Sequence, residues 1–152
     1  MDMKSILLHL KFGLCLPPQL KDDGDFASNT YFDTAGLAAV MFLIATGAVD
    51  IAIGSTAEGT APLVEECDTV GGSYTAVTSA ALADAIASTE GSKLFAVHVN
   101  LTKTHKRYMR VQAPHAGNGT VGANAGIIAI GVPDGTIPIT AAQQGLAELI
   151  SV

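Results

Sequence analysis

Apolar side chains alternate with polar or small ones near the start of the chain, and this pattern restricts the segment to one kind of structure. The apolar positions are Ile6, Leu8, Leu10, Phe12, Leu14 and Leu16. Successive side chains of a β-strand point to opposite faces of a sheet, so a two-residue period predicts a strand. Pro17 and Pro18 are expected to end it. The free energy gained by burying these side chains is comparable with the entropy cost of ordering the backbone. The strand is therefore stable only with a hydrogen-bonded neighbour.

Short apolar segments separated by Gly, Thr, Ser, Asn and Pro continue along the rest of the chain, which predicts an all-β fold. Their spacing is typical of an antiparallel β-sandwich or a jelly-roll-like barrel. We expect residues 1–20 to form an N-terminal strand or arm and residues 21–152 to form one domain. The further predicted strands are Leu37–Ala45, Val49–Ile53, Leu63–Asp68, Tyr74–Val77, Leu94–Leu101, Arg107–Ala113 and Asn124–Val132.

Two of these segments carry extra information in their patterns. Between residues 94 and 101, Phe95, Val97, Val99 and Leu101 share one face of the predicted strand, while Ala96, His98 and Asn100 share the other. This strand should therefore cover a core on one side. Residues 127–130 are apolar without a break, which predicts a strand covered on both faces, either central or at a subunit contact.

One or two short helices are also predicted. Leu82 and Ile86 lie four residues apart within Ser79–Ser88. The segment Thr140–Ile150 begins with Thr140 and Gln143 at the spacing of a capping box, although Gly145 weakens a helix there.

Charged residues are scarce: Lys, Arg, Asp and Glu make up 14% of the chain, against about 25% in an average soluble domain. Too few ionic groups are available to cover an independent globule, which predicts contact with other chains. The net charge of -6 opposes direct binding of nucleic acid. The apolar run Leu37–Ile53 contains Thr46, Gly47 and Asp50 and favours two strands around a turn over a membrane span.

The candidate catalytic and metal-binding residues do not form a recognised motif. Cys15 and Cys67 are interpreted as reduced, and Cys67 with His98 forms a weak candidate nucleophile and base. The carboxylates Glu65, Glu66 and Asp68 are interpreted as solvated, and so is the acidic loop that begins at Lys21, which lacks the calcium-loop spacing. We therefore predict no enzymatic activity, no cofactor and no metal.

A basic group lies in and just after one predicted inter-strand connection. It consists of Lys103, His105, Lys106, Arg107, Tyr108 and Arg110. A nucleic-acid contact is the alternative here, but in an acidic chain such a group more often faces solvent or an acidic protein surface. The candidate assembly-interface residues are Ile6, Leu8, Leu10, Phe12, Leu14, Lys106 and Arg107.

From Asp33 onward, the chain resembles small structural proteins of tailed bacteriophages, including capsid cement or decoration proteins. The residues that carry the resemblance are Asp33-Thr34-Ala35-Gly36, Asp50-Ile51-Ala52, Glu66-Cys67-Asp68-Thr69, Gly72-Ser73-Tyr74, Lys106-Arg107-Tyr108, Asn118-Gly119-Thr120 and Gly145-Leu146-Ala147-Glu148-Leu149. The resemblance implies a homo-oligomer, with a trimer favoured, that binds the outside of the major capsid protein shell and bridges its capsomers.

The expected location is therefore the virion capsid surface, after assembly in the host cytoplasm. The alternatives are a virion fibre or tail β-sandwich that binds a receptor or carbohydrate, and a head-tail connector component. An enzyme is the third possibility, favoured only where Cys67 and a histidine lie close together.

Overall fold

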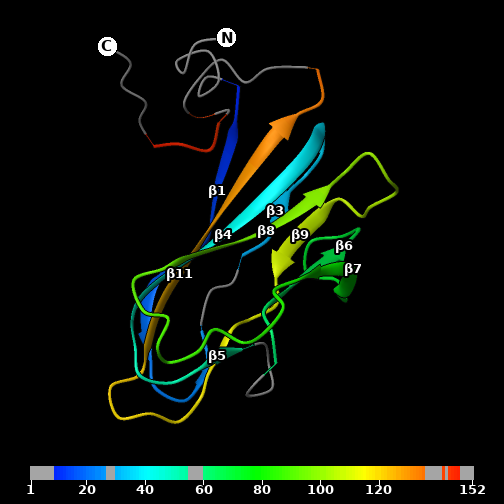
Figure 1. Ribbon diagram of the computed structural model, residues 1–152. Helices are drawn as coiled ribbons and strands as arrows, with labels where there is room; N and C mark the ends of the chain where they lie inside the picture. Colours follow the sequence, from blue (N-terminus) through cyan, green and yellow to red (C-terminus); the bar gives the residue numbers. More distant parts are fainter. Residues whose placement is uncertain (1–8, 27–29, 55–59, 136–141, 143, 148–152) are drawn as a thin grey trace.

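The computed structural model describes residues 9–26, 30–54, 60–135, 142 and 144–147, and all regular elements in these ranges are strands (Figure 1). The strands are β1 (Lys11–Lys21), β2 (Gly24–Asp25), β3 (Phe32–Asp33), β4 (Leu37–Val49), β5 (Ile53–Gly54), β6 (Leu63–Cys67), β7 (Thr75–Ala81), β8 (Leu94–Asn100), β9 (Tyr108–Val111), β10 (His115–Ala116) and β11 (Ala123–Pro133). The predicted all-β class is confirmed.

The longest strands form an antiparallel sheet in the order β1-β11-β4-β8, called the main sheet below. The register places Leu14 opposite Ile128, Ile128 opposite Leu43, and Leu43 opposite Ala96. This row fixes which side chains share a face, because neighbouring residues across a sheet point to the same side. The central position predicted for residues 127–130 is confirmed, since β11 lies between β1 and β4.

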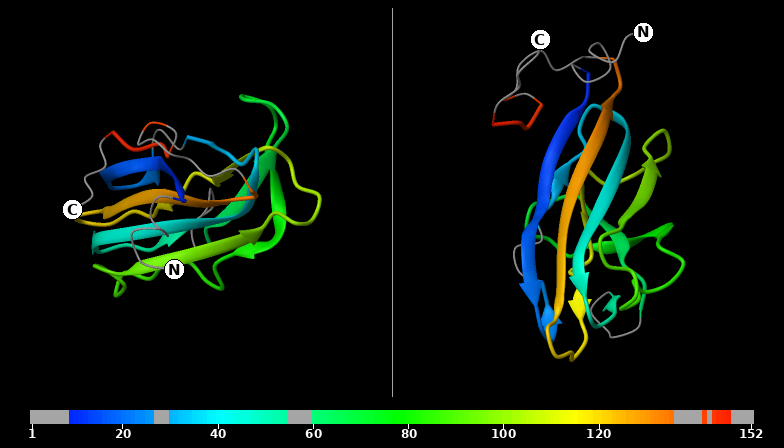
Figure 2. Two further views of the ribbon diagram at one scale, coloured as in Figure 1. Left: turned by 90° about the horizontal axis from the view of Figure 1, so that it is seen from above. Right: turned by 60° about the vertical axis from the view of Figure 1, so that its left-hand side comes forward.

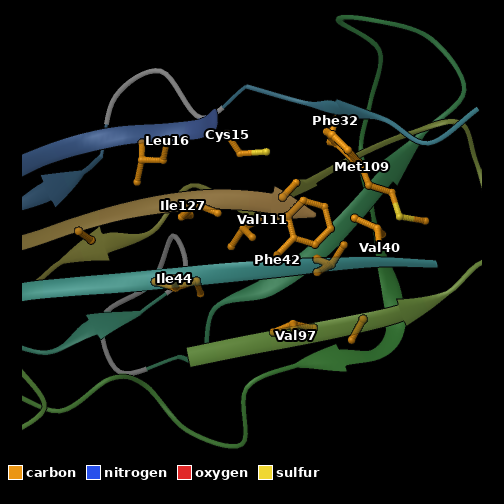
Figure 3. Packing of buried hydrophobic residues seen from close by; sticks show 14 of the residues in the cluster. Cys15, Leu16, Phe32, Val40, Phe42, Ile44, Val97, Met109, Val111 and Ile127 are labelled. Atoms are coloured by element: carbon orange, nitrogen blue, oxygen red, sulfur yellow. The ribbon is translucent and has the colours of Figure 1, made fainter. Parts of the chain in front are cut away.

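Two smaller sheets complete the fold. One has the order β3-β9-β6-β7 and the other the order β2-β10-β5. The β3-β9-β6-β7 sheet, called the second sheet below, packs against the inner face of the main sheet. Phe42 and Val40 therefore lie near Met109 and Val111 (Figure 3). These four side chains are at most 1% exposed. One continuous apolar core therefore holds two antiparallel layers together, as in a β-sandwich.

The first strand continues past the point at which the prolines were expected to end it. β1 includes Pro17 and Pro18 and reaches Lys21, with register shifts on either side of Leu16. Proline lacks a backbone N–H but is tolerated on an edge strand and at bulges, and β1 is an edge strand. A Cβ added at Gly126 on β11 would lie 3.3 Å from the Pro18 Cα, so glycine permits the close approach here.

The helix predicted for Ser79–Ser88 is wrong. β7 extends to Ala81, and the main-chain groups of Leu82 and Ile86 beyond it bond to distant segments. Ile86 N donates to Ile53 O at 2.9 Å, and Ile53 N donates to Ile86 O at 2.8 Å. These long-range bonds override the four-residue spacing of Leu82 and Ile86, because tertiary contacts outweigh a weak local preference.

Most of the helix predicted for Thr140–Ile150 lies outside the described residues. Of the described positions, Ala142, Gln144 and Gly145 form a turn, in which Gly145 N donates to Ala142 O at 3.1 Å. Gly145 has a φ of +77°, a left-handed conformation that ends helical geometry. The described part therefore has no helix.

Residues 37–54 contain two strands around a turn, but the turn lies later than the predicted bounds Leu37–Ala45 and Val49–Ile53 placed it. β4 runs without interruption from Leu37 through Thr46 and Gly47 to Val49. The Thr46 hydroxyl donates to Glu90 O at 2.9 Å and lies 3.1 Å from Lys93 O, which satisfies this polar group inside the strand. The turn follows at residues 50–52, before the short β5.

Candidate functional site

The face of the main sheet that points away from the core is almost entirely apolar. Alternation places Val40, Phe42 and Ile44 of β4 in the core, so Met41 and Leu43 between them point outward. The same argument applies to the strands paired with β4. The outer face, as defined by this register, includes Phe12, Leu14, Leu20, Ala39, Met41, Leu43, Ala45, Leu94, Ala96, His98, Asn100, Asn124, Ile128, Ile130 and Val132.

Large side chains of the outer face are open to solvent within the single chain. Leu14 is 57% exposed, Ile128 43%, Val132 47% and Leu94 63%. In the right-hand view of Figure 2, β1, β11 and β4 lie side by side. None of the outer-face residues is Lys, Arg, Asp or Glu. A contiguous apolar patch of this kind is typical of an interaction surface.

The prediction that residues 127–130 are covered on both faces is not met within one chain. Ile127 and Ala129 are completely buried, but Ile128 is exposed and Ile130 is half-buried. The unbroken apolar run therefore includes residues of the core and residues of the outer face. Contact of its second face with another subunit stays a prediction.

Several of the predicted assembly residues lie on or beside this face. Phe12 and Leu14 belong to the outer face, and Leu10 directly precedes β1 and is half-buried. Ile6 and Leu8 lie outside the described residues. The structure therefore places Phe12 and Leu14 on the same surface as Ile128 and Leu43.

The two edges of the main sheet differ. On the β1 edge, Phe12 N donates to Gln144 O at 2.5 Å and Thr30 N donates to Cys15 O at 2.7 Å. The chain thus covers part of this edge with its own backbone, so β1 is an integral strand here (Figure 2). The β8 edge has no pairing strand among the described residues.

Lys106 and Arg107, the other predicted interface residues, are engaged within the chain. Arg107 Nε and Nη2 donate to the two Asp33 carboxylate oxygens at 2.9 and 2.8 Å. This guanidinium lowers the pKa of Asp33 to about 2, and the carboxylate in turn raises the pKa of Arg107. Lys106 Nζ donates to the Thr75 hydroxyl at 3.0 Å. Their contact with a partner stays a prediction.

A polar groove of about 540 Å³ lies between β7 and the end of β8. Its lining includes His98, Lys103, His105, Glu66 and Ser79. The Glu66 carboxylate contacts His105 Nδ1 at 2.9 Å and accepts from Lys106 N at 3.2 Å. The His105–Glu66 pair was not predicted, because its members lie 39 residues apart in the sequence.

The cysteines do not join this groove. Cys67 does not line it, and its Sγ lies 4.0 Å from the Thr69 hydroxyl instead. Burial raises the pKa of the Cys15 thiol to about 12, so Cys15 stays protonated near neutral pH. The geometry gives no support to the pairing of Cys67 with His98 that sequence reasoning considered.

Acidic side chains gather at the opposite end of the main sheet, where they bind the chain itself. Asp50 accepts bonds from the backbone N–H groups of Thr120, Val121 and Gly122, and these bonds lower its pKa. His115 Nδ1 lies 3.1 Å from Asp25. Within the described ranges, no group of three His, Cys, Asp or Glu side chains is placed to hold a metal ion.

In comparisons with known proteins, no family model, curated protein or solved structure matches the chain. In the part of the chain that the structure describes, no helix is long and apolar enough to cross a membrane. The outer face is therefore the main structural feature from which a function can be argued. In the sequence, the continuous apolar run at residues 127–130 indicated such a surface. Sequence reasoning did not identify Met41 and Leu43 as part of it.

Proposed function

We propose that this protein is a structural subunit of a bacteriophage virion, a capsid cement or decoration protein that associates through the outer face of its main sheet. The observation that carries the proposal is that this face is apolar and uncharged, with Leu14, Ile128 and Leu94 each more than two-fifths exposed. The partners are other copies of the chain and the major capsid protein.

The physical argument is the hydrophobic effect. Removing apolar surface from water contributes about 25 cal/mol for each Å² buried, so a face with several open aliphatic side chains gains stability when another surface covers it. An apolar centre with few charges is also the composition of the fully buried part of protein interfaces. The low overall charge agrees with a chain that hides part of its surface in an assembly.

The virion setting comes from the sequence resemblance described above. A cement protein has to hold neighbouring capsomers together against the pressure of packaged DNA, which calls for a rigid body with broad contact surfaces. The two packed layers supply the rigid body, and the outer face supplies one such surface. Connector and fibre subunits would share these properties and differ in their location on the particle.

The experiment compares two lysine substitutions of exposed apolar residues. Ile128→Lys places a charge at the centre of the outer face, whereas Val121→Lys, the matched control, changes a 60% exposed side chain in the loop before β11. Both variants should keep the circular dichroism spectrum of the parent. We expect Ile128→Lys to lower both the oligomer mass in sedimentation and the occupancy of purified phage particles, and Val121→Lys to leave both unchanged.

Copy number per particle then separates the possible locations. Hundreds of copies support a cement role, whereas about six to twelve copies, as in a closed ring at a vertex or tail, support a connector or fibre instead. A stable monomer that is absent from purified particles would overturn the proposal. So would an Ile128→Lys variant that assembles like the parent.

A further inference from the structure

The free edge of β8 is a regular template for another strand. β8 has neither proline nor a register shift along its pairing with β4. Lys93 O accepts from Thr46 N, and Leu101 N donates to Ala38 O, so the odd-numbered residues bond toward β4. In an antiparallel ladder the alternate residues point their N–H and C=O groups the other way. Ala96, His98 and Asn100 therefore present backbone donors and acceptors at the open edge.

The polar groove lies at the end of this edge and contains a strained residue. β7 carries a register shift opposite β6, and Ser79 within it has a φ of +62°. Bulges of this kind redirect side chains, and left-handed non-glycine residues are concentrated at functional sites. Ser79 lines the groove together with Thr78, Thr104 and Asn100, which adds short polar side chains to the backbone edge.

Of the Lys, Arg, Asp and Glu side chains that line the groove, Glu66 is engaged within the chain and Lys103 is not. The Glu66 carboxylate is already bound by His105 and by Lys106 N, as described above. Lys103 is exposed and forms no ion pair with any described residue. His98 is likewise exposed and is one of the residues that line the groove. A carboxylate that enters here would meet an ammonium group without displacing an existing partner.

We propose that the β8 edge binds an extended segment of a partner protein by strand addition, with an acidic side chain of that segment directed to Lys103 in the groove. Main-chain bonds to His98 and its neighbours would supply affinity, and the carboxylate would supply register and specificity. This deepens the function proposed above, on which it rests for the identity of the partner as a coat protein. A second copy fits less well, because β8 contains no Asp or Glu to offer to Lys103.

The test uses the full chain and a library of random short peptides displayed on ribosomes, followed by affinity measurements with the enriched peptides. We expect the enriched peptides to share an Asp or Glu within a β-prone segment. His98→Pro removes one edge N–H and should weaken binding about fivefold to tenfold, whereas His98→Ala keeps that N–H and should bind like the parent. Lys103→Glu leaves β8 unchanged and should weaken the binding of the acidic peptides. Peptides whose Asp or Glu is replaced by a neutral residue should bind this variant and the parent equally.

Three outcomes would overturn the inference: a library that yields no binder, enriched peptides without acidic residues, or equal affinity of the His98→Pro and His98→Ala proteins while both stay folded. A full chain that forms dimers, and that His98→Pro converts to monomers, assigns the edge to a second copy and also overturns it. A different result would contradict the proposed virion role but not the binding of a strand at β8. In that case the protein is absent from particles while acidic peptides still bind β8 in a His98→Pro-sensitive manner.

Discussion

The two faces of the main sheet are built from similar residues but have different surroundings. On β4, Phe42 is completely buried against the second sheet, while its neighbours Met41 and Leu43 are half-buried on the outer face. Both faces are apolar, and strand periodicity alone does not distinguish them. The difference teaches that the second sheet of the same chain covers one face, whereas the other face is open to solvent in the single chain. Three sets of substitutions test how the parts of the molecule differ in stability.

The largest effect is expected from truncation of the inner face. Phe42→Ala should lower the free energy of unfolding by about 3–5 kcal/mol, because a large buried side chain is replaced by a cavity. Leu43→Ala, one residue away on the outer face, should cost less, about 1–2 kcal/mol, because its side chain is only partly buried. Urea denaturation of the two variants gives the comparison. Equal losses would mean that the outer face is as tightly packed as the core.

A smaller effect is expected from adding volume to the inner face. A Cβ at Gly13 would lie 2.6 Å from a ring carbon of Phe32, closer than real contacts allow. Gly13→Ala should therefore destabilise the protein by about 1–3 kcal/mol through overpacking. Adding Phe32→Leu should make the Gly13→Ala change less costly, which a double-mutant cycle in the same denaturation assay would detect. Simple additivity of the two substitutions would contradict the contact.

The smallest effect is expected at the polar rim where β3 meets β9. The folded-state pKa of Asp33 is about 2, below its ordinary value of 3.8, because Arg107 stabilises the carboxylate. The unfolded chain therefore takes up a proton more readily, so the stability from this pair is present above about pH 4 and is lost as the pH falls toward 2. The effect is modest because both side chains are partly exposed.

The variant that isolates this pair is Arg107→Gln, and the measurement is the melting temperature between pH 2 and pH 5. We expect a shallower pH dependence than in the parent. Lys106→Gln is the control, because Lys106 Nζ donates to the neutral Thr75 hydroxyl and should leave the slope unchanged. An identical slope in the Arg107→Gln protein would show that other carboxylates produce the acid sensitivity.

Sequence reasoning predicted the strands best where periodicity was strong. The alternation across residues 94–101 identified β8 and the face on which Val97 and Val99 are buried. It failed where long-range bonds decided the backbone, as at Ile53 and Ile86. It also misjudged Pro17 and Pro18, because an edge strand tolerates residues that a central strand does not.

The candidate site was accessible from the sequence only in part. Phe12 and Leu14 were predicted to lie at an interface, and the structure places them on the outer face. The pairing of His105 with Glu66 and the groove beside β8 were not predictable, because they join segments that no local pattern connects. The same holds for the Arg107–Asp33 pair, whose members lie 74 residues apart.

By itself, the sequence determined that this protein is a set of antiparallel strands with too few charges to cover its own surface. A period of two and the scarcity of ionic side chains are local and compositional properties, so they can be read without coordinates. Only the tertiary structure decided which apolar side chains enter the core and which edge stays open. Those outcomes depend on strand order and register, and a shift of one residue would exchange the two faces.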